Sequence, residues 1–360
     1  MSTPRRALIA AGGTGGHIFP ARAATQELVD LGWEVRLITD ARGFKHTDGF
    51  PALSIDVIKA ASPITKNPIK LATAWLQLFS GWRDCRRIIK QWQPDVVAGF
   101  GGYPAFPALL AAQQKRIPFA IHEQNTVLGR VNRVFAKTAG FVASGFDRLD
   151  RLPEAATHQV LGNPVRQPII EAREDAFPAT DGKLLLLVLG GSMGARILSE
   201  TVPQAVAKLP ESLRSRLVVA QQTREESLDM ARDIYSNAGV DAVCEPFFTD
   251  VAARLSTSHL VIARAGASSV SEIACVGRPA IFIPLAIAMD DHQTGNAAHL
   301  VEAGAADAIP EHAFSSEELT QLLETRLSDP AELQRRAAKA HAKGKPEAGK
   351  EFAQALAALV

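Results

Sequence analysis

Short apolar runs alternate with longer segments of mixed polarity along almost the whole chain. Runs such as 184–189 and 260–263 contain no polar position, which is typical of strands buried on both faces of a parallel sheet. In the longer segments apolar residues recur at helical spacing. The alternation therefore predicts an α/β fold whose parallel sheets are covered by helices on both faces.

The predicted strands are Arg6–Ala10, Glu34–Thr39, Val96–Gly99, Phe119–Ile121, Phe141–Ala143, Leu184–Leu189, Leu217–Ala220, Ala242–Glu245, Leu260–Ala263 and Ala280–Ile283. The predicted helices are Ala21–Leu31, Leu71–Trp92, Ala105–Gln114, Ala195–Leu209, Glu225–Asn237, Ser268–Val276, Ala298–Ala303 and Leu333–Val360, the last with a break at Gly344–Pro346. A chain of 360 residues is long for one core, and two prolines and a glycine in Gly162–Pro168 interrupt helix and strand alike. We therefore expect a first domain at 1–163, a second at 164–344, and a final helix at 345–360 that packs back on the first.

Each half of the chain has a glycine-rich turn after its first apolar run. These turns are Ala11–His17 and Gly190–Ala195. Glycine allows close approach of the backbone to a ligand, and the helix that follows offers free N–H groups to an anion. Neither turn has the dinucleotide or P-loop spacing of glycines, so tight packing of strand on helix is the alternative interpretation.

Two further polar turns follow strands of the first half, Gly99–Pro104 and His122–Asn125. Because ligands bind at the carboxyl ends of strands in open α/β sheets, three loops at this edge predict a site. His17, at the mouth of the first turn, would be a neutral imidazole able to accept a hydroxyl proton near pH 7.

The second half contains the segment Arg264–Glu272, with small and hydroxyl residues at a helix start. Such a start can hold a diphosphate, and Glu272 could accept hydrogen bonds from a ribose. An ordinary serine-capped helix with a capping-box glutamate is the alternative. In Asp290–Asn296, we favour hydrogen bonding of a sugar by Gln293 and Asn296 over metal binding.

Aromatic and basic residues gather in Leu71–Arg87 and just before it. This combination suits an anionic membrane surface, whereas a core-facing helix with a solvated basic face is the alternative. The residues concerned are Trp75, Leu76, Leu78, Phe79, Trp82, Lys66, Lys70, Arg83, Arg86 and Arg87.

Composition argues against several classes of protein. The net charge of +1 gives no reason to expect nucleic-acid binding. The cysteines Cys85, Cys244 and Cys275 lie far apart without metal spacing, as expected of reduced thiols in the cytosol. The apolar run after Arg6 is too short for a signal peptide, and no run has the roughly 18 apolar residues of a membrane span. A cytoplasmic protein is expected, with peripheral membrane contact left open.

The combined motifs resemble, in order and spacing, those of the MurG family of glycosyltransferases, over essentially the whole chain. They are Gly12–His17, Gly101–Tyr103, His122–Asn125, Gly162–Arg166, Gly190–Arg196 and Ser271–Glu272. The resemblance implies a GT-B fold, two Rossmann-like domains with parallel sheets facing a central cleft. It implies inverting transfer of N-acetylglucosamine from UDP-N-acetylglucosamine to the C4 hydroxyl of the muramyl sugar of lipid I, giving lipid II for peptidoglycan. We expect no cofactor, and no divalent metal is obviously required, because a helix dipole and its hydrogen-bond donors could stabilise the leaving charge.

The resemblance also implies roles for single residues. His17 matches the general base, Phe248 a uracil contact made through the backbone. Positions matched to the donor are Thr14, Gly15, Gly16, Asn125, Arg166, Ser192, Phe248, Ala267, Ser268, Ser269, Val270, Ser271, Glu272, Gln293 and Asn296. Positions assigned to the acceptor are Gly12, Gly13, Gly101, Gly102, Tyr103, His122, Glu123 and Gln124, and to the membrane Trp75, Leu76, Phe79 and Trp82.

The family is peripheral to the cytoplasmic face of the inner membrane, which the resemblance implies here, and partners among cell-wall synthesis proteins stay open. Three positions depart from the family's pattern: His292, Ser268 and the segment Gln221–Arg224. The alternatives are a UDP-sugar 2-epimerase of the same fold, a non-catalytic UDP-sugar-binding subunit, and a nicotinamide oxidoreductase. The missing dinucleotide fingerprint weakens the last, and the basic aromatic stretch argues against the first.

Overall fold

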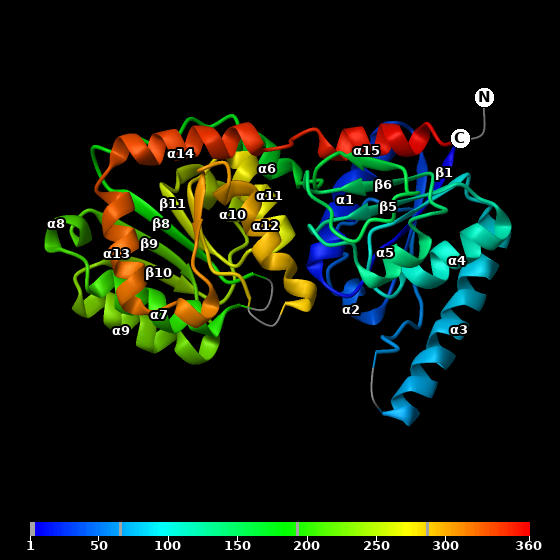
Figure 1. The fold of residues 1–360 in the computed structure, drawn as a ribbon, viewed down its shortest axis with the longest axis horizontal. Helices are drawn as coiled ribbons and strands as arrows, with labels where there is room; N and C mark the ends of the chain where they lie inside the picture. Colours follow the sequence, from blue (N-terminus) through cyan, green and yellow to red (C-terminus); the bar gives the residue numbers. More distant parts are fainter. Residues whose placement is uncertain (1–3, 65–66, 192–193, 286–287) are drawn as a thin grey trace. The chain divides into compact units, whose positions relative to one another are not determined.

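The computed structural model describes residues 4–64, 67–191, 194–285 and 288–360. The chain divides into two compact units (Figure 1). Unit 1 comprises Met1–Arg166 and Lys345–Val360, and unit 2 comprises Gln167–Gly344. Unit 2 is therefore inserted into the sequence of unit 1.

Unit 1 is built on a parallel sheet. Among its described residues the sheet has seven strands in the order β3-β2-β1-β4-β5-β6-β7. The strands are β1 Arg6–Ala10, β2 Glu34–Thr39, β3 Ser54–Val57, β4 Val96–Gly99, β5 Phe119–Glu123, β6 Phe141–Ser144 and β7 His158–Val160. The helices are α1 Gly15–Asp30, α2 Ala41–Phe44, α3 Pro68–Trp92, α4 Ala105–Lys115, α5 Arg130–Phe135 and α15 Ala348–Ala357.

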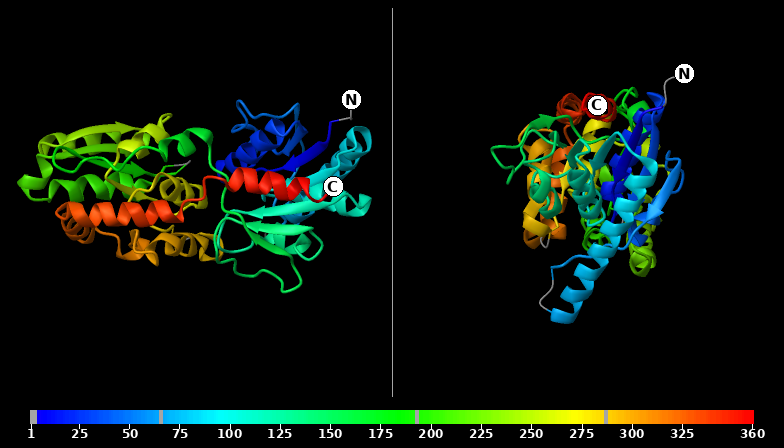
Figure 2. Two further views of the ribbon diagram at one scale, coloured as in Figure 1. Left: turned by 90° about the horizontal axis from the view of Figure 1, so that it is seen from above. Right: turned by 90° about the vertical axis from the view of Figure 1, so that its right-hand side faces the viewer.

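The alternation of side chains along β1 gives unit 1 two buried layers. Ala7 and Ile9 belong to a core that includes residues of α1 and α15, whereas Leu8 and Ala10 belong to one that includes α3 and α4. The C-terminal helix α15 thus runs along the same face of the sheet as α1, as the red and blue helices of Figures 1 and 2 show.

Unit 2 repeats the design. Its described residues form a parallel sheet of six strands in the order β10-β9-β8-β11-β12-β13. The strands are β8 Leu184–Leu189, β9 Leu217–Gln222, β10 Asp241–Glu245, β11 Leu260–Ala263, β12 Ala280–Phe282 and β13 Ala306–Ala308. The helices are α6 Gln167–Ala172, α7 Arg196–Ala207, α8 Glu211–Arg214, α9 Leu228–Asn237, α10 Val251–Thr257, α11 Ala267–Val276, α12 His292–Val301, α13 Ser316–Leu327 and α14 Pro330–Lys343, with short 3₁₀ helices at Glu225–Ser227, Met289–Asp291 and Glu311–Ala313.

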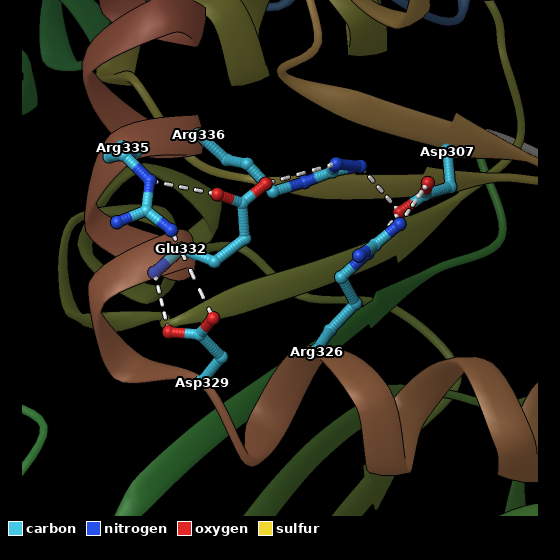
Figure 3. A network of polar contacts seen from close by, with 6 residues as sticks. All are labelled: Asp307, Arg326, Asp329, Glu332, Arg335 and Arg336. Carbon is cyan, nitrogen blue, oxygen red and sulfur yellow. Dashed lines mark hydrogen bonds and ion pairs between the residues drawn. The ribbon is translucent and has the colours of Figure 1, made fainter.

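One carboxylate ties the edge strand of unit 2 to the helices that follow it (Figure 3). Asp307 of β13 accepts two hydrogen bonds from Arg326 of α13, at 2.8 and 2.7 Å, and one from Arg336 of α14, at 2.6 Å. The Arg336 side chain is buried, so this pairing compensates a charge that is removed from water. It fixes α14, which leads the chain back to unit 1.

The predicted α/β class is confirmed, but several boundaries differ. Helix α1 begins at Gly15 rather than Ala21, because the glycine-rich turn itself enters the helix. Helix α12 begins at His292 rather than Ala298. Helix α6 begins at Gln167, inside the segment expected to interrupt both element types, because Pro168 is in its first turn, where proline is tolerated. Strands β3, β7 and β13 and helices α2, α5, α8, α10 and α13 were not expected from the pattern.

Replacing Phe352 of α15 by alanine should destabilise unit 1 by about 3–5 kcal/mol, since its ring is fully buried against Phe100 and Phe141. All four tryptophans lie in unit 1, so tryptophan fluorescence during urea unfolding reports this unit. The matched control is exposed Gln354→Ala on the same helix, expected to change stability by less than about 0.5 kcal/mol. Equal midpoints for the two variants would show that α15 is not part of this core.

Candidate functional site

The first glycine-rich turn of unit 1 is held by Asp40, at the end of β2. Gly13 has a φ of +88° and donates its N–H to Oδ1 of Asp40 at 2.9 Å. The same oxygen accepts from the N–H of Gly43 at 2.9 Å. Sequence reasoning missed Asp40, although a polar residue directly after a predicted strand was the available signal. The turn lies at the carboxyl end of β1, and Thr14 is the exposed N-cap of α1.

The turn after β4 packs on the turn after β1 through bare backbone. Gly102 has a φ of +75°, and a Cβ there would lie 2.4 Å from the carbonyl oxygen of Gly12. Gly101 has a φ of +89°, and a Cβ there would lie 3.3 Å from Cε1 of His17. The next residue, Tyr103, accepts a hydrogen bond from the Ser62 hydroxyl at 2.7 Å. The structure therefore brings these acceptor-assigned glycines into contact with the turn that carries His17.

Behind His17 lies a chain of polar groups. Nδ1 of His17 is 3.2 Å from Oε1 of Gln124, and Nε2 of Gln124 is 3.1 Å from Nδ1 of His122. Nε2 of His122 is 2.9 Å from the carbonyl oxygen of Gly162. The side chains of His122 and Gln124 are buried, whereas His17 is half-buried. Sequence reasoning placed these residues at one loop cluster but gave no hint that they form one chain.

Burial lowers the pKa of His17 to about 4, against an opposing effect of the Asp40 carboxylate. Burial likewise lowers the pKa of His122 to about 4, although its hydrogen bond to Gly162 favours the charged form. Both imidazoles are neutral at pH 7. The His17 ring therefore has one nitrogen lone pair available to accept a proton.

Glu123 organises the loop after β5 from inside. Its carboxylate accepts hydrogen bonds from the N–H and side chain of Asn125, at 3.1 and 3.2 Å. It also accepts from the N–H of Gly129 and the side chain of Asn132, each at 2.8 Å. Burial raises the pKa of Glu123, and these four donors counteract that effect. Asn163 adds a bond from its side chain to the carbonyl of Gln124 at 3.0 Å.

The second glycine-rich turn, in unit 2, is braced by a glutamine. Oε1 of Gln222 accepts from the N–H of Gly190 at 3.0 Å, and its Nε2 donates to the carbonyl of Gly191 at 3.3 Å. Gly191 and Gly194 both have positive φ. Ser192, assigned to the donor, lies outside the described residues, as does Lys66 of the membrane stretch. Gln222 was noted in the sequence only as part of a departure from the family pattern, and its bracing role was missed.

Helix α11 starts differently from a serine-capped helix. Its N-cap is Gly266, without a capping hydrogen bond from a side chain, so the capping-box interpretation is wrong. The hydroxyl of Ser268 is buried and has no hydrogen-bond partner among the described residues. Glu272 lies half-buried one turn further on. The start of α11 therefore presents backbone N–H groups and small side chains at the carboxyl end of β11.

Two amides of α12 hold neighbouring loops. Oε1 of Gln293 accepts from the N–H of Leu285 at 2.9 Å, and Nδ2 of Asn296 donates to the carbonyl of Ala265 at 3.1 Å. Asn296 is fully buried. The ring of Phe248 is buried beneath the guanidinium of Arg254, which lies 4.0 Å from the ring centroid, and the uracil assignment of this residue stays a prediction. In the described parts of the chain no three His, Cys, Asp or Glu side chains are grouped to hold a metal ion.

Helix α3 has apolar residues on two sides: one side packs against the core, and the other is exposed to solvent. Ala74, Leu78 and Cys85 are buried, whereas Trp75, Leu76 and Phe79 are 54%, 67% and 55% exposed. The core-facing alternative is therefore wrong for these three. Trp82 is half-buried and donates to Gln114 at 3.0 Å. Farther along, the exposed side carries basic residues, Arg83, Arg86, Arg87 and Lys90. No helix in the described residues is long and apolar enough to cross a membrane.

Arg166 lies at the end of the first segment of unit 1, with its guanidinium over the ring of Phe19 at 5.6 Å. Phe19 belongs to the first turn of α1. The structure thus places Arg166 beside the helix start that carries His17. The donor assignment of Arg166 stays a prediction.

Comparison with known proteins agrees with this arrangement. Residues 7–144 match the glycosyltransferase family 28 N-terminal domain and residues 185–352 its C-terminal domain. The chain is 62% identical over 362 residues to the UDP-N-acetylglucosamine–N-acetylmuramyl-(pentapeptide) pyrophosphoryl-undecaprenol N-acetylglucosamine transferase of Maricaulis maris, which covers 99% of this chain and 98% of that protein. The same-named transferase of Caulobacter vibrioides is 46% identical over 349 residues, 96% of this chain and 97% of that protein.

Two solved structures are informative. The crystal structure of Acinetobacter baumannii MurG superposes with a TM-score of 0.80 at 31% identity, over 99% of this chain and 100% of that one. The UDP-GlcNAc 2-epimerase of Neisseria meningitidis, bound to UDP-GlcNAc, superposes with a TM-score of 0.70 at 14% identity, over 98% of this chain and 100% of that one. The second likeness shows a shared fold only.

The backbone contact at Gly102 yields a prediction. Gly102→Ala should destabilise unit 1 by clearly more than Gly32→Ala, because both glycines have positive φ but only Gly102 would clash. Gly32→Ala, with open space around it, should cost about 1–2 kcal/mol from its left-handed backbone alone. Urea unfolding followed by tryptophan fluorescence measures both. Equal losses would show that the contact with Gly12 does not constrain the site.

Proposed function

The chain belongs to the MurG family within glycosyltransferase family 28, and we propose that it transfers N-acetylglucosamine from UDP-N-acetylglucosamine to the C4 hydroxyl of the muramyl sugar of lipid I, giving lipid II. The observation that carries the proposal is the neutral His17 imidazole at the glycine-rich turn of unit 1. Family identity over nearly the whole chain supports it.

In the proposed reaction unit 2 holds the donor. The diphosphate lies at the start of α11, where backbone N–H groups, the helix dipole and the Ser268 hydroxyl stabilise the charge that develops on the leaving UDP. Glu272 accepts hydrogen bonds from the ribose, and the backbone at Phe248 contacts uracil. Gln293 and Asn296 keep the adjacent loops in place for the sugar.

Unit 1 holds the acceptor. Its diphosphate lies over the turn Gly12–Thr14 and the first turn of α1. His17 removes the C4 hydroxyl proton as the oxygen attacks C1 of the sugar from the face opposite UDP, which inverts the configuration. The negative diphosphate favours the imidazolium form of His17, so acceptor binding raises the proton affinity of the base when it is needed. In this proposal the loop after β5 is held in shape by His122, Glu123 and Gln124, which do not contact the acceptor themselves. Their side chains are buried and hydrogen-bonded inside the protein.

We further propose that the protein is peripheral to the cytoplasmic face of the inner membrane. The exposed apolar residues of α3 would enter the interface, and the basic residues that follow on its exposed side would contact anionic head groups. The lipid tail of the acceptor lies in the same membrane, so α3 would bring unit 1 to its substrate. Other proteins of cell-wall synthesis are candidate partners.

Turnover should depend on an acceptor. UDP release from UDP-N-acetylglucosamine is measured in detergent with and without a lipid I analogue, and the product is identified by mass. We expect release only with the analogue, together with the disaccharide product. Donor conversion without an acceptor would favour an epimerase, and tight donor binding without turnover would favour a binding subunit.

Turnover in the same assay should also be insensitive to a chelator of divalent metals. A loss of turnover in the chelator, restored by magnesium, would contradict stabilisation of UDP by helix α11 alone.

In the same assay, His17→Ala should lower kcat by about two to four orders of magnitude, the contribution typical of a general base. The donor Kd, measured by calorimetry, should change little, because the proposed contacts to the diphosphate, the ribose and uracil at α11 and Phe248 are in unit 2. Near-normal turnover with intact donor binding would remove His17 from the role of base.

The double variant Trp75→Ala/Phe79→Ala should bind vesicles of phosphatidylglycerol and phosphatidylcholine at least about tenfold more weakly, since burial of each large apolar side chain contributes about 1.5–3 kcal/mol. The matched control is Gln77→Ala, an exposed polar residue of the same helix. Sedimentation with vesicles measures binding. Unchanged binding of the double variant would exclude this face of α3 as the membrane contact.

A further inference from the structure

The chain of polar groups behind His17 has a fixed direction. At one end, the carbonyl oxygen of Gly162 can only accept a hydrogen bond. Nε2 of His122, 2.9 Å away, must therefore carry the proton that it donates. Because burial keeps this imidazole neutral, its other nitrogen, Nδ1, has a lone pair and can only accept.

The orientation of the Gln124 amide follows. One end of this side chain lies 3.1 Å from Nδ1 of His122 and 3.0 Å from the carbonyl oxygen of Phe100. Both are acceptors, so the amide nitrogen must be at that end. The amide oxygen is thereby directed at His17, and it can only accept.

The consequence reaches His17. Its Nδ1, 3.2 Å from Oε1 of Gln124, must be the nitrogen that carries the proton, because a lone pair there would face the lone pairs of the amide oxygen. In a neutral ring the lone pair is then on Nε2. A Cβ at position 101 would lie only 3.3 Å from Cε1 of this ring, so a glycine there leaves room for the imidazole in this position.

We propose that Gln124, oriented by His122, is a positioning residue that fixes the tautomer of His17 and so presents the Nε2 lone pair to the acceptor hydroxyl. The catalytic consequence rests on the proposed function, whereas the tautomer itself does not. The step is a proton transfer from the acceptor oxygen to Nε2 of His17, and Nδ1 keeps its proton throughout.

A neutral amide suits this site better than a carboxylate. It orients the imidazole without adding a negative charge beside the proposed position of the acceptor diphosphate. It also leaves Asp40, from the end of β2, as the charge that acts on His17, while His122 of β5 is neutral. The His17 ring therefore stays neutral at pH 7, with the lone pair of Nε2 available to accept a proton.

The tautomer is measured without any substrate. Long-range ¹H–¹⁵N NMR spectra of the full-length protein labelled on histidine distinguish a protonated from an unprotonated nitrogen in each ring. The His17 signal is assigned by its loss in His17→Gln. We expect the protonated nitrogen at Nδ1 in the wild type. A proton on Nε2 instead would overturn the proposal.

Two variants test the cause. In Gln124→Ala the His17 signal should move to the Nε2-protonated form or to a mixture, and kcat should fall by about 10- to 100-fold, part of what a general base contributes. KM and the donor Kd should stay within about twofold.

His122→Phe keeps an aromatic ring that can stack on Phe100 but removes the nitrogen acceptor that orients the Gln124 amide. This variant should therefore give a mixture of His17 tautomers, although Gln124 is still present. Exposed Gln113→Ala in α4 is the matched control for a lost glutamine.

Gln124→Glu should change the pH dependence of kcat/KM, which would stay the same if Gln124 had only a structural role. A carboxylate at this position favours the imidazolium form, so the acid limb of the kcat/KM profile should shift to higher pH. An unchanged acid limb of the pH profile would contradict contact between the side chain at position 124 and His17.

An Nδ1-protonated His17 that persists in both Gln124→Ala and His122→Phe would overturn the assignment of Gln124. If the wild type has the expected tautomer but no acceptor-dependent turnover, the proposed function fails and the structural inference stands.

Discussion

The contact between the carbonyl of Gly12 and the backbone of Gly102 is the constraint on which the proposed acceptor site of unit 1 depends. Two loops from neighbouring strands meet there without any side chain between them. A methyl group at Gly12 or Gly102 would clash across this contact and force the two loops apart. A methyl group at the neighbouring Gly101 would lie only 3.3 Å from Cε1 of His17 and crowd the imidazole.

Neutral amides brace loops in both units, in addition to the carboxylates of Asp40 and Glu123 in unit 1. Gln124 and Asn163 hold the loop after β5, whereas Gln222 and Asn296 hold the loops after β8 and β11. An amide satisfies both a donor and an acceptor of the backbone without adding net charge. Loops proposed to receive phosphate groups thus gain rigidity from these amides without a further negative charge beside the ligand.

Much of the fold could be predicted from the sequence, because strands such as β8 and β11 are buried on both faces and therefore apolar throughout. Strands β3, β7 and β13 could not, since they lie at or near sheet edges and read SIDV, HQV and ADA, without an apolar run. The start of α1 was missed because glycines usually mark turns, yet here Gly15 and Gly16 are helical. Within the site, the loops and His17 were predictable from their places after strands. The chain of polar groups from Gly162 to His17 was not, because His122 is 40 residues from Gly162 and Gln124 is 107 from His17, and only the folded sheet edge joins them.

The place of α15 affects how the chain is made. Most of unit 1 precedes unit 2 in the sequence, yet Phe352 and Leu356, which follow unit 2, complete its core. On the ribosome the whole of unit 2 emerges before that core can close. The first unit must therefore wait, with one face of its sheet only partly covered, while the inserted unit folds. A chain truncated before Ala348 would contain all of unit 2 but lack the helix that completes the core of unit 1, which reverses the usual order from N-terminus to C-terminus.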